Sequence, residues 1–231
     1  MTHRALAAFT GLALAGLLAG PQTAHAAPQV ERIRGTIETV EADTVAIRTL
    51  DGRMEAVALT PQTRYASLVR SSLSAITDGS FIGTATKGDD PPTALEIHIF
   101  PESMRGTGEG HRDWDTIPDT LAGGTRVRSA MTNGTVKAGP GAGPRVKSAM
   151  TNGTVASRAA AGGATTLVVS YGKDQSLTIL VPPQAPIVAY EPADRAIVQA
   201  GGKVFLTAER DGERLTALRV AVGKDGLVPP Q

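Results

Sequence analysis

Residues 44–62 read TVAIRTLDGRMEAVALTPQ, and residues 166–184 repeat the pattern as TLVVSYGKDQSLTILVPPQ. In both stretches apolar residues alternate with polar ones on each side of a turn, and both stretches end in Pro-Gln. Alternation with a period of two is typical of strands with one buried face, and Asp51-Gly52 is a strong hairpin signal. The repeated stretch therefore predicts a β-hairpin that is present in two copies.

The similarity continues beyond the hairpin. When residue 44 is aligned with residue 166, Gly79 aligns with Gly201. After one inserted residue, Thr93-Ala94-Leu95 aligns with Thr216-Ala217-Leu218. Order and spacing are kept between residues 44–99 and residues 166–222 with a single gap. The chain therefore contains an internal duplication, which we call the first copy and the second copy.

The two copies predict the same short elements. Val69, Leu73 and Ile76 share one face at helical spacing, so we expect a short helix over residues 67–76, and residues 194–199 take its place in the second copy. The strands that we expect are 33–40, 44–50, 54–59, 81–86 and 94–100 in the first copy, and 166–171, 176–181, 203–209 and 215–222 in the second.

This order of elements predicts a mainly β fold. Three strands, a helix and two strands follow one another as in an OB-like five-stranded barrel, which leaves few unpaired strand edges. We expect two tandem OB-like barrels, each with one short helix, at residues 30–101 and 149–226, joined by a flexible linker at 102–148. A simple antiparallel meander is the alternative.

A shorter repeat precedes the second copy. Residues 126–136 recur as residues 145–155, and the only change is Arg128 to Lys147. Either segment can supply the first strand of the second barrel. We favour the nearer one, around residues 150–155, because its shorter loop costs slightly less entropy to close. Deletion of residues 126–144 is then expected to leave stability nearly unchanged.

The N-terminus predicts export. Arg4 precedes an apolar run of about 16 residues, and Ala24-His25-Ala26 forms a small-x-small cleavage pattern, so residues 1–26 are expected to be a signal peptide. The run is shorter than the roughly 20 residues that a membrane span needs. Because the chain contains no cysteine, it has neither disulfides nor a lipid-modified cysteine, which favours a bacterial periplasmic or secreted protein.

Composition excludes some partners. Loss of Arg4 with the signal reduces the 23 basic residues to 22, which equals the 22 acidic residues. With no net charge and few aromatic residues for base stacking, the mature chain is not expected to bind nucleic acid, and after cleavage no segment is apolar enough to span a membrane.

Three further stretches carry a resemblance: EGHRDWD at residues 109–115, MTNGTV at residues 131–136 and AVGKDG at residues 221–226. Together with the doubled β unit, they resemble a family of exported proteobacterial proteins of unknown function with small OB-like repeats. Similar chains sometimes carry the label of a metal-transporter permease. The resemblance implies the fold and the export, and it implies no activity or site residues.

One cluster of possible metal ligands lies between the copies. Glu109, His111, Asp113 and Asp115 alternate beside Trp114, and such oxygen and imidazole ligands suit an exchangeable Zn²⁺ or Mn²⁺. A polar linker anchored by the tryptophan is the other interpretation. His98 is expected at the surface, since the second copy has Ala221 in its place.

No catalytic motif is present: we find no G-x-S-x-G elbow, nucleophilic cysteine or P-loop. We therefore expect a non-enzymatic binding or scaffolding module that contacts an envelope protein or polymer and needs no cofactor. The alternative is a periplasmic metal-binding accessory of a transport system.

Overall fold

The computed structural model describes residues 28–137 and 165–230, and strands dominate both ranges. The strands are β1 (Gln29–Val40), β2 (Thr44–Thr49), β3 (Met54–Ala58), β4 (Arg64–Arg70), β5 (Phe81–Lys87), β6 (Thr93–Ile99), β7 (Gly110–Asp113), β8 (Ile117–Pro118), β9 (Arg126–Val127), β10 (Ala130–Lys137), β11 (Thr165–Tyr171), β12 (Gln175–Val181), β13 (Ile187–Ala193), β14 (Lys203–Asp211) and β15 (Arg214–Gly223). The mainly β prediction is confirmed. None of the helices in the described ranges is long and apolar enough to cross a membrane.

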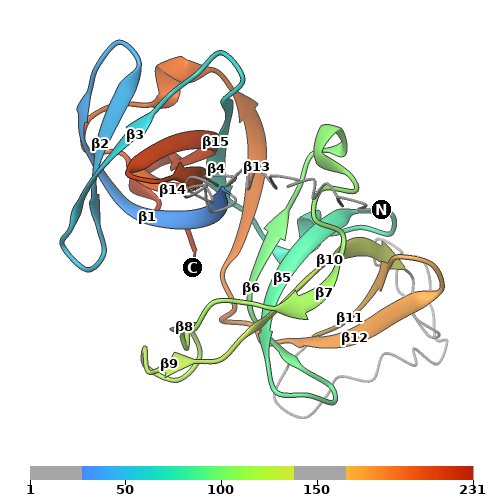
Figure 1. Ribbon diagram of the computed structural model, residues 1–231. Coiled ribbons are helices and arrows are strands. Elements are labelled where there is room, and N and C mark those ends of the chain that lie inside the picture. The colour runs from blue at the N-terminus through green and yellow to red at the C-terminus, as the bar shows by residue number, and fades with distance from the viewer. Residues whose placement is uncertain (1–27, 138–164, 231) are drawn as a thin grey trace, which may run out of the picture.

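The strands close into two rings, which form the two lobes of Figure 1. The first barrel consists of β1, β2, β3, β15 and β14, and the parallel pairing of β15 with β3 closes it. The second barrel consists of β10, β11, β12, β6 and β5, and the parallel pairing of β12 with β6 closes it. The two rings have the same order of strands and the same directions of pairing.

The barrels do not coincide with the copies. The first barrel combines β1, which precedes the first copy, with β2 and β3 of the first copy and with β14 and β15 of the second. The second barrel takes β5 and β6 from the first copy, and pairs them with β10, β11 and β12. We predicted one separate barrel at residues 30–101 and another at residues 149–226. This prediction is wrong, because each barrel contains strands from both copies.

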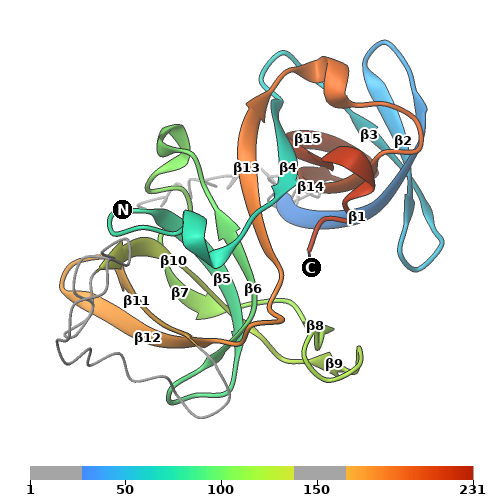
Figure 2. The ribbon, with the colours of Figure 1, turned by 180° about the vertical axis from the view of Figure 1, so that it is seen from behind.

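The exchange runs through β4 and β13, which cross between the lobes side by side (Figure 2). They pair with each other antiparallel, with Leu68 opposite Tyr190. Each also pairs in parallel with one barrel, β4 with β15 and β13 with β6. Side chains from this crossing and from the C-terminal end form a small core that joins the two barrels: Ala66, Leu68, Val188, Tyr190, Ala221 and Leu227.

The crossing also explains why the predicted helices are wrong. Residues 67–70 belong to β4, and only a single 3-10 turn follows, at Leu73–Ala75. In the second copy the corresponding turn is Arg195–Ile197. Of the apolar residues that suggested a helix face, Val69 lies in β4, and Leu73 and Ile76 pack against the core of the second barrel. The tertiary environment thus overrides a weak local preference.

Residues 102–137, the described part of the predicted linker, are more ordered than a flexible linker. β7 pairs with β10, and β8 pairs with β9 in a separate two-stranded sheet. The first strand of the second barrel is Ala130–Lys137, from the earlier member of the short repeat, whereas we favoured residues 150–155, which lie outside the described residues. Deletion of residues 126–144 thus removes a strand that the structure uses.

Matching glycines mark the equivalent strands. A side-chain carbon added to Gly35 in β1 would lie 2.1 Å from the carbonyl oxygen of Arg48, and one added to Gly134 in β10 would lie 2.2 Å from that of Ser170. In each barrel, the first strand therefore passes so close to its neighbour that only glycine fits. This shared contact fixes the alignment of β10 with β1.

Candidate ligand cavity between the barrels

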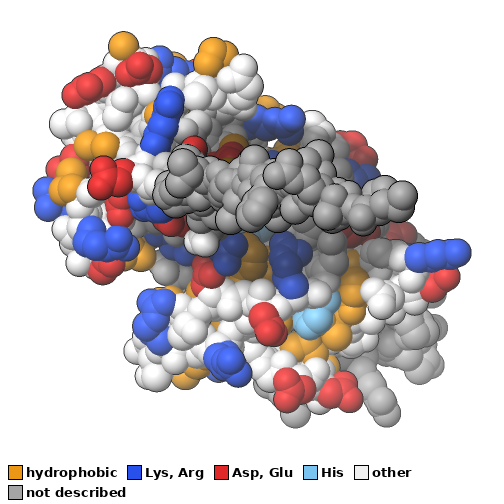
Figure 3. Space-filling view, viewed as in Figure 1, with side chains coloured by type: hydrophobic (Ala, Val, Ile, Leu, Met, Phe, Trp, Pro, Cys, Tyr) orange, Lys and Arg blue, Asp and Glu red, His pale blue; other side chains and the backbone are white. Residues whose placement is uncertain are grey.

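A cavity of about 380 Å³ lies where the two barrels face each other. Its walls come from β1, β14 and β15 of the first barrel, from β6 and β10 of the second, and from β13 and the β7 region. Figure 3 shows basic side chains and apolar surface next to each other along the junction of the two lobes. The cavity exists only because the strand exchange holds the barrels together.

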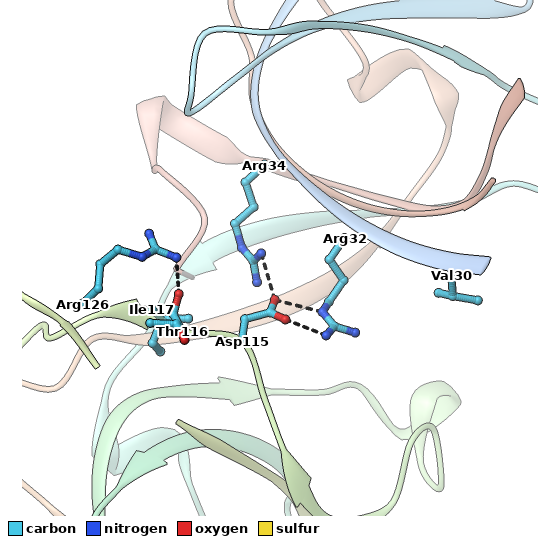
Figure 4. A pocket seen from close by; sticks show the side chains of 7 residues that line it. All are labelled: Val30, Arg32, Arg34, Asp115, Thr116, Ile117 and Arg126. Atoms are coloured by element: carbon cyan, nitrogen blue, oxygen red, sulfur yellow. Dashed lines mark hydrogen bonds and ion pairs between the residues drawn. The ribbon is translucent and has the colours of Figure 1, made fainter. Parts of the chain in front are cut away.

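Two arginines of β1 are fixed at the edge of this cavity. Arg32 donates to both oxygens of Asp115, with its Nη2 2.6 Å from Oδ1, and Arg34 Nη1 lies 3.2 Å from Oδ2 (Figure 4). The hydrogen bonds from Arg32 are the main reason that the pKa of Asp115 lies below its usual range. A second hollow, of about 370 Å³, is lined by this ion pair together with Thr116 and Arg126.

Two other arginines line the cavity without an ion-pair partner among the described residues. Arg112 donates from Nη1 to the carbonyl oxygen of Gly108 at 2.7 Å. The side chain of Arg219 makes no hydrogen bond with any other described residue. Both side chains are half-buried, and this burial lowers the pKa of both guanidinium groups. A half-buried cation that lacks a counter-ion is costly, so these two groups attract a negative charge.

Two acceptors face the same space. Glu96 is fully buried on β6; its Oε1 lies 3.0 Å from His98 Nε2, whereas Oε2 has no partner. Asn133 on β10 donates from Nδ2 to the carbonyl oxygen of Thr107 at 3.3 Å, and its Oδ1 has no partner. A buried polar atom without a hydrogen bond costs about 1–3 kcal/mol, so such atoms are rare in folded proteins.

These atoms are concentrated at one place. Within the described ranges, the buried side-chain nitrogen and oxygen atoms that lack a partner are Arg34 Nε, Glu96 Oε2, Trp114 Nε1 and Asn133 Oδ1. All four residues line the cavity between the barrels. Two of the atoms are donors and two are acceptors, so the cavity offers unused hydrogen bonds of both kinds.

Aromatic rings form the remaining wall. The ring centroids of Phe100 and Tyr190 are 5.0 Å apart, and those of His98 and Tyr190 are 5.8 Å apart. Arg34 lies over Phe205, with Cζ 4.6 Å from the ring centroid. Burial raises the pKa of the Tyr190 hydroxyl. The cavity thus combines an apolar wall with a few directed polar groups, as ligand sites commonly do.

The predicted metal ligands have separate contacts. Glu109 Oε1 accepts from the backbone nitrogen of Gly172 at 3.2 Å, and His111 Nδ1 lies 2.8 Å from Thr132 Oγ1. Asp113 is exposed, and Asp115 holds the two arginines of β1. Across residues 28–137 and 165–230, no three His, Asp or Glu side chains are close enough to hold a metal ion. Metal binding at this segment stays a prediction.

Sequence reasoning missed most of the cavity. His98, expected at the surface, is buried, with 6% of its surface exposed, because β13 pairs beside it. The signal that was available is the contrast between the copies: positions 96 and 98 carry Glu and His, and the matching positions 219 and 221 carry Arg and Ala. Without the exchange, these four residues would not be expected in one cavity.

No protein-family model, no curated protein and no solved structure matches this chain. The cavity is therefore interpreted from its own geometry.

Proposed function

We propose that the chain is an exported, non-enzymatic binding protein that holds a small anionic molecule in the cavity between its barrels. The observation that carries the proposal is the pair of half-buried arginines, Arg112 and Arg219, which line the cavity with no carboxylate partner in residues 28–137 and 165–230. A guanidinium group presents a planar fork of donors that matches a carboxylate or a phosphate.

The charge balance of the cavity supports an anion. Four arginines contribute to its walls, the two already named together with Arg32 and Arg34. In the part of the chain that the structure describes, two carboxylates balance them: Glu96 in the wall and Asp115 beside it. The excess of two positive charges acts in a partly desolvated space, where Coulomb attraction is stronger than in water. The aromatic wall suits a ligand with an apolar body.

The location and the fold belong to the same proposal. The apolar run before Ala24-His25-Ala26 supports export to the periplasm or the medium, where an envelope protein or polymer is a further possible partner. In each ring the first strand pairs with the second and the fourth, and the third pairs in parallel with the fifth. This order supports an OB-like assignment of both barrels, each built from strands of both copies.

Calorimetry on the mature chain from Ala27 tests the anion site. The probes are 3-phenylpropionate and 3-phenylpropylamine, which share an apolar body and differ in charge, at equal ionic strength. We expect saturable binding of the carboxylate at an affinity at least tenfold above that of the amine. Equal affinities, or no binding of the carboxylate, would overturn the proposal.

A matched pair of variants locates the site. Arg219→Gln removes a guanidinium group from the cavity, and Arg214→Gln removes an exposed one from the same strand. We expect the first to weaken 3-phenylpropionate binding at least tenfold and the second to leave it within twofold. Equal affinities of the two variants would place the anion elsewhere.

A further inference from the structure

The two barrels are related by equivalent positions, which the strand pairing fixes. Gly35 in β1 pairs with Val204, and Gly134 in β10 pairs with Ile82, so the two glycines are equivalent. Counting back by one residue makes Arg34 the equivalent of Asn133. Both residues line the cavity, one from each barrel.

A second equivalent pair comes from the last strands. The register between β6 and β5 shifts by one residue at a β-bulge in β6, and beside this bulge Glu96 lies opposite Ala85. The register between β15 and β14 shifts at the equivalent position, and beside this bulge Arg219 lies opposite Thr207. Glu96 and Arg219 are thus equivalent positions with opposite charge, and both line the cavity.

The bulky groups are also arranged in opposite ways. His98 pairs with Gly83 in the second barrel, whereas the equivalent pair in the first barrel is Ala221 with Phe205. Each barrel therefore pairs one ring with one small residue at this position. The ring lies on the last strand of the second barrel, β6, but on the fourth strand of the first barrel, β14. The cavity is lined by equivalent strands and yet has no symmetry in its chemistry.

This asymmetry has a direction. The first barrel presents Arg34 and Arg219, and the second presents the unpartnered oxygens of Glu96 and Asn133. Glu96 and Arg34 influence each other electrostatically, although they form no ion pair. The β7 segment beside the second barrel adds the donors Arg112 and Trp114 Nε1, so the division is not complete. The buried carboxylate of Glu96 opposite the two arginines of the first barrel suits a ligand with an acceptor at one end and a donor at the other.

We propose that the cavity binds a zwitterion, an α-amino acid with an apolar side chain. Its carboxylate lies toward Arg34 and Arg219, its ammonium toward Glu96, and its side chain against the aromatic wall. This inference rests on the proposed anion site and adds the ammonium end. A cavity of about 380 Å³ is at the small end for ligand pockets and suits a molecule of this size.

The decisive comparison is between L-phenylalanine and 3-phenylpropionate, which differ by the ammonium group alone. We expect calorimetry on the mature chain to show at least tenfold tighter binding of L-phenylalanine. Equal or weaker binding of L-phenylalanine overturns the zwitterion and leaves the anion site standing. The two proposals therefore fail in different ways.

Variants then assign each end of the ligand. Glu96→Gln keeps the shape of the buried side chain and removes its charge; we expect it to weaken L-phenylalanine binding at least tenfold and to leave 3-phenylpropionate within twofold. Glu213→Gln, in the exposed turn before β15, is the matched control and should change neither affinity. A parallel loss for both probes in Glu96→Gln would overturn the assignment of Glu96.

Arg219→Met keeps the test decisive if Glu96→Gln fails to fold. We expect this variant to weaken L-phenylalanine and 3-phenylpropionate by the same factor, since both carry the carboxylate. A loss confined to L-phenylalanine would reverse the orientation of the ligand and overturn the inference.

Discussion

The first barrel and the second barrel are alike inside and different where they face each other. Equivalent core positions carry similar aliphatic residues: Ile47 matches Val169, Val57 matches Ile179, and Ile97 matches Val220, and all are at most 1% exposed. At the cavity, by contrast, Arg34 matches Asn133 and Glu96 matches Arg219. Packing has thus preserved a pattern of volume and apolarity, whereas the facing surfaces carry different chemistry.

The comparison teaches where to look for function in a duplicated protein. A core position must fill its space in both copies, so its residue type is constrained in both. A cavity position has no such constraint and can differ between the copies. The divergent pairs that line one cavity are therefore better indicators of a site than any single residue.

The largest expected effect is at the crossing that unites the barrels. Leu68→Ala leaves a hole beside Tyr190 at a fully buried position, and we expect a loss of about 3–4 kcal/mol in the free energy of unfolding. Because both barrels share strands of both copies, denaturation followed by Trp114 fluorescence and by circular dichroism should show one coincident transition. Leu50→Ala, 63% exposed, is the control and should change stability by at most about 0.5 kcal/mol. Two separate transitions would contradict the shared architecture.

The two glycines sharpen the comparison of the barrels. Gly35→Ala forces a side chain against the carbonyl of Arg48, and we expect a loss of about 3 kcal/mol. Gly134→Ala meets the same obstacle at Ser170, but residues 149–155 repeat residues 130–136 without a change and offer a substitute strand. We expect Gly134→Ala to lose less than half as much in chemical denaturation. An equal loss in the two variants would show that the repeat does not substitute.

A smaller effect is expected at the ion pair beside the cavity. Hydrogen bonds from Arg32 are the main reason that the pKa of Asp115 is depressed in the folded state. The ionised Asp115 therefore stabilises the fold fully above the unfolded pKa of about 3.9, and this stabilisation is lost as the pH falls toward the folded pKa. We expect Asp115→Asn to cost about 1 kcal/mol at pH 7, since the pair is partly exposed, and nothing once Asp115 is protonated. Thermal melts between pH 2 and pH 7 measure this difference. Asp113→Asn, at the exposed end of β7, is the control, and its stability should follow the wild-type dependence on pH. The same loss of stability at pH 7 in both variants would contradict the role of Asp115.

The smallest effect is expected for metal ions. Because Glu109, His111, Asp113 and Asp115 have separate contacts, we expect calorimetry with Zn²⁺ and Mn²⁺ to give the same weak heats for the wild type and for His111→Ala. Saturable Zn²⁺ binding that disappears in His111→Ala would restore the alternative function as a metal-binding accessory.

The sequence alone determined the local structure of this protein. Alternating apolar residues and the turn signals such as Asp51-Gly52 specified most strands, since a strand with one buried face needs little more than its own pattern. The duplication specified that two similar units exist. The segment at residues 67–70 was the exception, because its short apolar run suits either a helix or a strand, and only its neighbours β13 and β15 decided in favour of the strand.

Tertiary structure alone decided which strands pair. A copy that closes on itself and a copy that exchanges its last two strands bury the same residues, so hydrophobic patterning cannot distinguish them. The crossing of β4 with β13 favours the exchanged arrangement. It pairs the backbone hydrogen-bonding groups of both strands, and it joins the two barrel cores through contacts of Leu68 and Tyr190. The cavity follows from that choice: Glu96 and Arg219 are 123 residues apart in the chain and face one space only because their barrels are built from each other's strands.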